Sequence, residues 1–80
     1  MINVMPNPFQ NQKVKVSLTG NFGQILDIEV YNMAGQLIHQ EQRPFSQMFE
    51  INLTGKNLSN GIYQLKVNNY TKMIQKKGMN

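Results

Sequence analysis

The sequence predicts an all-β fold: a small antiparallel β-sandwich, immunoglobulin-like or fibronectin-like, with six to seven strands. Apolar and polar residues alternate with a period of two in several short runs, as in strands that bury one face. Glycine, asparagine and proline fall between these runs at near-regular spacing, which favours a sandwich or a barrel. No segment of adequate length has its apolar residues at helical spacing.

The alternation is clearest in four runs, 13–18, 25–31, 48–53 and 62–67. Successive side chains of a strand point to opposite faces, so the apolar residues of each run should share the core side. The residues expected to face the core are Val14, Val16, Leu18, Leu26, Ile28, Val30, Phe49, Ile51, Leu53, Tyr63, Leu65 and Val67.

Other strands are expected near 37–41 and at the C-terminal end, and a seventh at 2–5, "INVM". Two of them contain adjacent apolar residues, so the pattern leaves open which residue faces the core. The two ambiguous pairs are Leu37 with Ile38 and Met73 with Ile74.

Two turns have specific chemistry. Gly35 is expected to supply a positive φ in a tight hairpin turn, and the Asn32 side chain can cap that turn. Asn68 and Asn69 are expected to form a type I′ turn, because asparagine tolerates the left-handed region that both positions of this turn require.

The chain has 80 residues and no cysteine. It is therefore at most one domain, without disulfides or a cysteine-type zinc site. Its stability must come from packing. No apolar run approaches the ~20 residues that span a bilayer, no signal peptide is visible, and we expect the chain to be part of a longer exported protein.

The net charge of +4 is concentrated near the C-terminus, because the four basic and four acidic residues before position 66 cancel. Two interpretations remain open. The C-terminal lysines can meet an anionic partner, or they can solvate an edge strand and block edge-to-edge pairing. Nucleic-acid binding is not expected, because Tyr70 is the one tyrosine that the pattern places outward among these lysines.

Residues suited to catalysis are scarce. His39 is the only histidine, and the alternation places it opposite Ile38, on the solvent side of its strand. Asp27 and Glu29 share a strand face, which is most simply the wet face. No serine has the context of an activated nucleophile. We therefore expect no enzymatic activity, no cofactor and no metal site.

Four motifs occur in order: "PNPF" at 6–9, "VYNMAGQLI" at 30–38, "LSNGIYQLKV" at 58–67 and "TKMIQKK" at 71–77. Together they resemble the C-terminal sorting domain, type A, of proteins exported by the type IX secretion system of Bacteroidota. The resemblance covers residues 4–77. Each motif alone is weak, whereas all four in this order are fairly specific.

This resemblance implies that residues 1–80 are one C-terminal sorting domain that follows a cargo domain. Its expected function is to direct the cargo through the outer-membrane type IX translocon. The implied partners are translocon and shuttle components and a sortase-like peptidase that removes the domain, after which the cargo is attached to the surface. The expected localisation is the periplasm in transit, then the cell surface or the exterior.

The resemblance also implies roles for particular residues. Gly61 and Tyr63 would build the C-terminal hairpin, and the lysines would offer charge to an acidic receptor. The implied recognition residues are Gly61, Tyr63, Lys72, Lys76 and Lys77, and the implied structural residues are Pro6, Asn7, Pro8, Phe9, Tyr31, Asn32 and Gly35.

Two other functions remain open from the sequence. A cell-surface binding or adhesion module would need a groove lined by exposed aromatic residues, but the chain has only four phenylalanines and three tyrosines. A fibronectin-like spacer would tolerate changes on the outward side of its last strand. An open sheet edge would also allow a weak homodimer.

Overall fold

The computed structural model describes residues 1–5 and 12–78, which form seven β-strands and no helix. The all-β prediction is confirmed, including the strand at "INVM". No described segment is a helix that could cross a membrane. The strands are β1 (Ile2–Met5), β2 (Lys13–Leu18), β3 (Ile25–Asn32), β4 (Leu37–Pro44), β5 (Met48–Asn52), β6 (Gly61–Val67) and β7 (Tyr70–Lys76).

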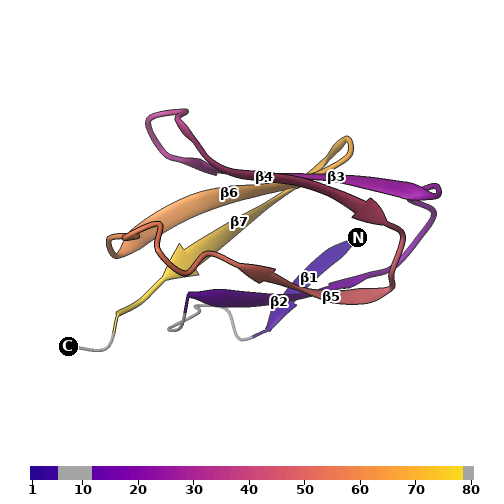
Figure 1. Ribbon diagram of the computed structural model, residues 1–80, viewed down its shortest axis with the longest axis horizontal. Helices are drawn as coiled ribbons and strands as arrows, with labels where there is room; N and C mark the ends of the chain where they lie inside the picture. Colours follow the sequence, from indigo (N-terminus) through magenta and orange to yellow (C-terminus); the bar gives the residue numbers. More distant parts are fainter. Residues whose placement is uncertain (6–11, 79–80) are drawn as a thin grey trace.

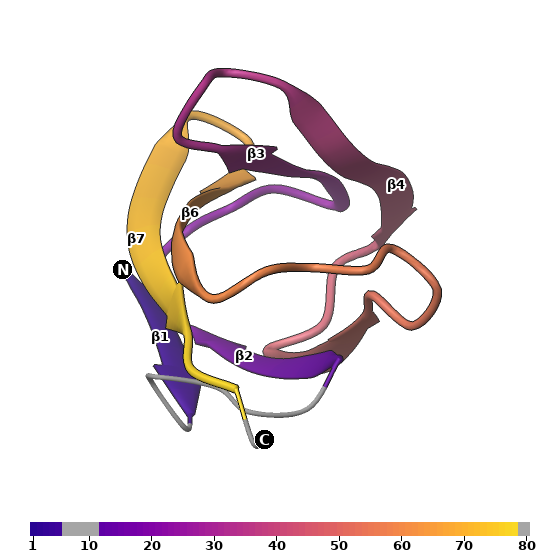
Figure 2. The same cartoon turned by 90° about the vertical axis from the view of Figure 1, so that its left-hand side faces the viewer.

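The strands form two antiparallel sheets stacked as a sandwich (Figure 1). One sheet has the order β1-β2-β5 and the other has the order β4-β3-β6-β7. The edge strands β1 and β7 lie next to each other, so one side of the sandwich is closed by the first and last strands (Figure 2). β4 and β5 are the edge strands on the opposite side.

One hydrophobic core fills the space between the sheets. The residues expected to face the core are all buried except Phe49, which is partly buried and packs against the core. Each fully buried aliphatic side chain stabilises the fold by about 1.5–3 kcal/mol. Ile2, Val4, Phe22 and Ile74 are also buried. Phe22 comes from the loop before β3, which the strand pattern did not predict.

The structure resolves both ambiguous pairs. Ile74 is 1% exposed and Met73 is 44% exposed, so Ile74 faces the core. Leu37 is 49% exposed, whereas Ile38 packs against the core. Leu37 of β4 pairs with Tyr31, whereas the neighbouring residue of β3, Val30, pairs with His39, because a β-bulge shifts the register between them.

The same bulge overturns the prediction that His39 lies on the solvent side. His39 pairs with the buried Val30, so it is on the core side of the sheet. The register shifts between Val30 and Tyr31, which leaves Ile38 as the extra residue of β4. A bulge residue breaks the strict alternation, so Ile38 and His39 both point inward.

His39, Glu41 and Arg43 form a polar row along the core side of β4. His39 Nε2 lies 2.7 Å from Glu41 Oε1, and an Arg43 nitrogen lies 2.7 Å from Glu41 Oε2. Inward-pointing charged residues on an edge strand discourage pairing with another chain. The row therefore fits the edge position of β4.

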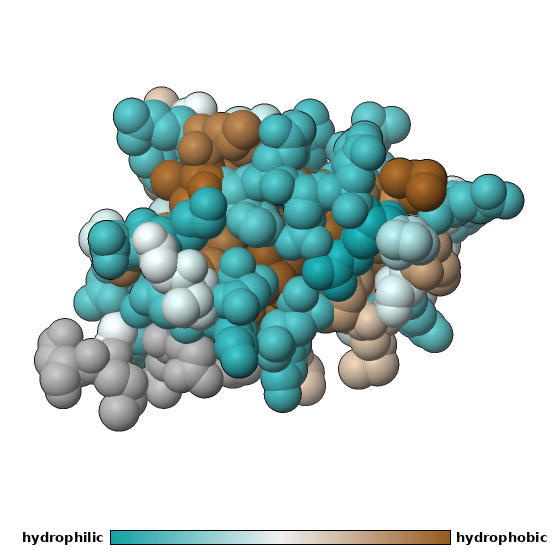
Figure 3. Space-filling view, viewed as in Figure 1, coloured by the Kyte–Doolittle hydropathy of each residue, from teal (hydrophilic) through white to brown (hydrophobic). Residues whose placement is uncertain are grey.

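Arg43 also joins the two sheets at this side of the sandwich. Its guanidinium donates a hydrogen bond to the Glu50 carbonyl of β5 (3.3 Å) and lies 5.0 Å from the centre of the Phe49 ring. Figure 3 shows hydrophilic residues over most of this side, with hydrophobic colour visible between the two layers. Polar side chains therefore cover the core where no strand does.

The β3–β4 hairpin confirms the predicted turn. Gly35 has a φ of 85°, and its N–H donates to the Asn32 carbonyl at 3.0 Å. The Asn32 Oδ1 accepts hydrogen bonds from the N–H groups of Ala34 (3.0 Å) and Gln36 (2.9 Å). The Asn32 N–H also donates to the Gln36 carbonyl at 3.0 Å, which closes a loop of three residues, 33–35, with glycine in the left-handed position.

The prediction of a type I′ turn in the β6–β7 hairpin was wrong. Of the two loop residues only Asn68 has a positive φ, 54°, whereas a type I′ turn requires a positive φ at both. The Asn68 side chain accepts from the N–H of Asp27 (2.8 Å) and donates to the Phe22 carbonyl (2.7 Å), and its own N–H donates to the Asp27 carbonyl (2.9 Å). These tertiary bonds fix Asn68 and hold the hairpin against β3.

Replacing Asn68 by alanine is expected to lower the free energy of unfolding by about 1–3 kcal/mol, because hydrogen-bonding groups lose their partners. Asn68→Gly should cost less, since glycine adopts a positive φ without strain. Urea unfolding measures both. The control Asn69→Ala, at an exposed position, should change stability by less than about 0.5 kcal/mol. Equal losses at both asparagines would contradict this role.

Glu41 makes stability depend on pH. Burial alone raises its pKa, but the hydrogen bonds from His39 and Arg43 and their positive charges outweigh it, so the pKa of Glu41 lies below its ordinary 4.5. A lowered pKa in the folded state gives stability that is present above pH 4.5 and is lost as the pH falls through the lowered value.

Wild type should therefore exceed Glu41→Gln in stability near neutral pH by up to about 1 kcal/mol, because the group is partly exposed. The difference should shrink as the solution becomes acidic, as measured by urea unfolding at a series of pH values. Glu50→Gln, which removes an exposed carboxylate, is the control. A stability gap for Glu41→Gln that stays constant with pH would argue against the ion pairs as its source.

Candidate functional site

The C-terminal hairpin of β6 and β7 is the candidate site. β6 is an interior strand of its sheet and β7 is an edge strand, and they pair in register from Gly61 opposite Lys76 to Val67 opposite Tyr70. Gly61 begins β6 with a φ of 146°, which L-residues with a side chain rarely adopt. Gly61 therefore sets the direction in which the chain enters the hairpin.

Tyr63 anchors the start of the hairpin in the core, as predicted. Its ring is buried and its hydroxyl donates a 2.7 Å hydrogen bond to the Ser59 carbonyl, four residues upstream. A tyrosine that bonds back to the backbone just before its strand is a feature of sandwich domains. The bond satisfies a buried hydroxyl and fixes the loop that leads to Gly61.

The three lysines implied by the resemblance lie in different environments. Lys77 is exposed and Lys72 is half-buried, whereas Lys76 is only 7% exposed. The Lys76 ammonium is not a buried polar atom without a partner. Its aliphatic stem is therefore buried, while its ammonium reaches water. Lys72 and Lys77 present their charge more openly.

The structural residues of the resemblance are only partly described. Pro6, Asn7, Pro8 and Phe9 lie outside the described residues. Tyr31 lies on the outer face of its sheet, and its hydroxyl donates a 2.9 Å hydrogen bond to Glu29 Oε1. This hydrogen bond, with smaller effects of desolvation and of the carboxylate charge, raises the pKa of Tyr31 above its ordinary 10.0.

The described residues show no arrangement suited to catalysis. No group of three or more His, Cys, Asp or Glu side chains among them could hold a metal ion. His39 is bonded to Glu41, and Asp27 accepts a 2.6 Å hydrogen bond from Gln42 Nε2. Both contacts join side chains on the same face of a sheet, and neither of them joins a nucleophilic side chain to a base.

The sequence reasoning missed a second surface. A depression crosses the outer face of the β1-β2-β5 sheet, and Lys72 of the last strand borders it. Met5 and Met48 line it and are 72% and 73% exposed. The sequence contained the evidence for this surface, because both methionines occur at strand positions where the alternation places polar, solvent-facing residues.

The comparison with protein families identifies the domain. The family model described as "Secretion system C-terminal sorting domain" matches residues 3–79, nearly the whole chain. The search of curated proteins found no significant match. The family is a secretion signal domain rather than an enzymatic one. The chain therefore belongs to the C-terminal sorting domain family of the type IX secretion system.

Proposed function

We propose that this domain is the export address at the C-terminal end of a longer protein, and that the secretion machinery recognises its last hairpin. Membership of the family implies a cargo that precedes the domain and export to the cell surface or beyond. A translocon or shuttle component binds the folded domain in the periplasm. A sortase-like peptidase then removes the domain, and the cargo is attached to the surface.

The single observation that carries the proposal is the match of the sorting-domain family to residues 3–79. The charge of the last hairpin supports it. No acidic residue follows Glu50 in the sequence, so no acidic side chain of this part of the chain neutralises Lys72 and Lys77. Unpaired positive charge on an exposed strand steers and orients an acidic receptor surface.

The implied recognition residues divide into two kinds. Gly61, Tyr63 and Lys76 act by building the hairpin: Gly61 provides its entry, Tyr63 its buried anchor and Lys76 the packing of its stem. Lys72 and Lys77 contact the receptor directly. A change at the first kind should reduce folding and export together, whereas a change at the second kind should reduce export alone.

A secretion reporter tests this proposal. Residues 1–80 are fused behind a signal peptide and a fluorescent protein in a bacterium with the type IX system and in a strain without its translocon. The double variant Lys72→Ala/Lys77→Ala should retain its unfolding midpoint but be exported several-fold less. The matched control Lys13→Ala/Lys56→Ala removes the same charge from exposed positions elsewhere and should be exported like wild type.

The intact mass of the exported reporter tests whether the domain is removed. If a peptidase removes it, the exported reporter should have the mass of the fluorescent protein without the domain. Reporter trapped inside wild-type cells, with the domain folded, would contradict the sorting function and favour a binding or spacer module. If the two double variants are exported equally well, the sorting function stands, but Lys72 and Lys77 do not take part in recognition. Truncation after Asn69, which deletes β7, should abolish export.

A further inference from the structure

The outer face of the β1-β2-β5 sheet carries a groove that runs across the strands. Asn3 pairs with Ser17 and Ser17 with Met48, which gives one row of outward side chains. Met5 pairs with Lys15 and Lys15 with Glu50, which gives a second row two residues further along each strand.

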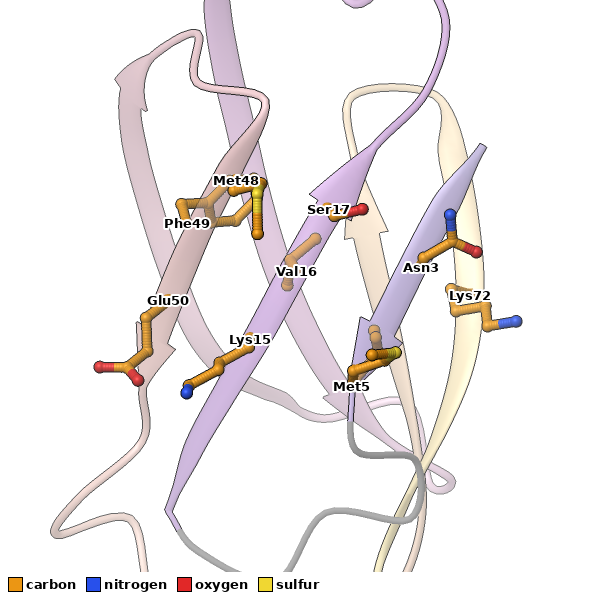
Figure 4. A pocket seen from close by; sticks show the side chains of 10 residues that line it. Asn3, Met5, Lys15, Val16, Ser17, Met48, Phe49, Glu50 and Lys72 are labelled. Atoms are coloured by element: carbon orange, nitrogen blue, oxygen red, sulfur yellow. The ribbon is translucent and has the colours of Figure 1, made fainter.

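The two rows form the walls of the groove. Residues two apart on a strand are separated by roughly 6.5–7 Å, which leaves room for the side chains of a bound segment. The floor is the backbone of the residues between the rows, whose side chains point into the core. Figure 4 shows the rows crossing β5, β2 and β1, with Lys72 of β7 beyond β1.

Both walls contain a highly exposed methionine. Met48 is on one wall and Met5 is on the other, and each exposes more than two thirds of its surface. A methionine at a solvent-facing strand position gains little for the fold. Its flexible, polarisable thioether is suited to packing against a partner's apolar side chains, so the pair indicates a partner with apolar side chains.

The charges around the groove indicate the other part of the partner's chemistry. Lys15 and Lys72 border it from β2 and β7, and Glu50 borders it at the β5 end. Within the described part of the chain, neither lysine forms an ion pair, although Lys15 lies directly across from Glu50. Unpaired lysines at the rim of a groove walled by two exposed methionines favour an acidic side chain next to apolar ones.

We propose that this groove binds a segment of a partner protein that places apolar side chains between Met5 and Met48 and an acidic side chain at Lys72. The proposal rests on the proposed export function and identifies a second contact for the same receptor. β1 and β7 are neighbours, so the groove and the last strand form one continuous surface. A second copy of this chain is a poorer occupant, because its lysines would face these lysines.

The test is a titration of the 80-residue domain with two short synthetic peptides, followed through the methionine methyl signals by NMR. Both peptides carry leucines and one methionine; one ends in two glutamates and its twin ends in two lysines. The acidic peptide should shift the methyl signals of Met5 and Met48. It should bind about threefold to fivefold more tightly than its twin, the scale of one exposed ion pair.

Two variants make the test specific. Lys72→Glu should reverse the preference, so that the basic peptide binds more tightly. The control Lys66→Glu changes a lysine on the outer face of the other sheet, opposite Glu29, and should leave the preference unchanged. A preference that survives Lys72→Glu, or shifts confined to Met33 and Met73, would overturn the proposal. So would methyl shifts that depend only on protein concentration, which would identify a second copy as the occupant.

The export reporter separates this proposal from the proposed function. Met5→Gln/Met48→Gln should be exported several-fold less than wild type, whereas Met33→Gln, at another exposed methionine, should be exported normally. Normal export of the double variant would exclude the groove while the sorting function stands. Failure of the wild-type domain to export its reporter would contradict the sorting function, and the peptide titration would still decide whether the groove binds an acidic segment.

Discussion

All of the described strands depend on one layer of aliphatic side chains shared between the two sheets. The chain has no cysteine, so no disulfide compensates for the loss of part of this layer. β7 is an edge strand, yet it contributes Ile74 to the core and lies beside β1. The hairpin proposed as the export address is therefore also part of the structure that keeps the domain folded. This couples the display of the signal to the completion of folding.

The two sides of the sandwich are closed differently, and this difference decides which surfaces are open to a partner. On one side Glu41 and Arg43 cover the core and link β4 to β5, and an inward-facing charged row discourages further strand pairing. On the other side the first and last strands meet, and β7 carries Lys72 and Lys76 in the same phase as the buried Ile74. Lys72 and the groove of the β1-β2-β5 sheet are both reached from this second side, so the proposed receptor meets a charged and an apolar contact together.

Much of the fold could be predicted because strand alternation depends only on neighbouring residues. The period of two identified the core side of β2, β3, β5 and β6, and the family motifs identified the C-terminal hairpin as the candidate site. The β3–β4 turn was predictable for the same reason, since Gly35 and Asn32 satisfy it within a few residues. Local chemistry was sufficient where the residues of a turn hydrogen-bond to one another, as in the β3–β4 turn.

The all-β class, most of the core and the family therefore follow from the sequence alone. Three properties depend on the tertiary structure: which residues of β4 face the core, the conformation of the Asn68 turn, and the exposure of single side chains. The bulge at Ile38 moved His39 to the core side, and bonds from β3 selected the conformation of Asn68. Lys76 is buried and Lys72 is more exposed because of the way β7 packs at the sheet edge. These properties arise from contacts between residues distant in the sequence, which the spacing of residues along one strand does not encode.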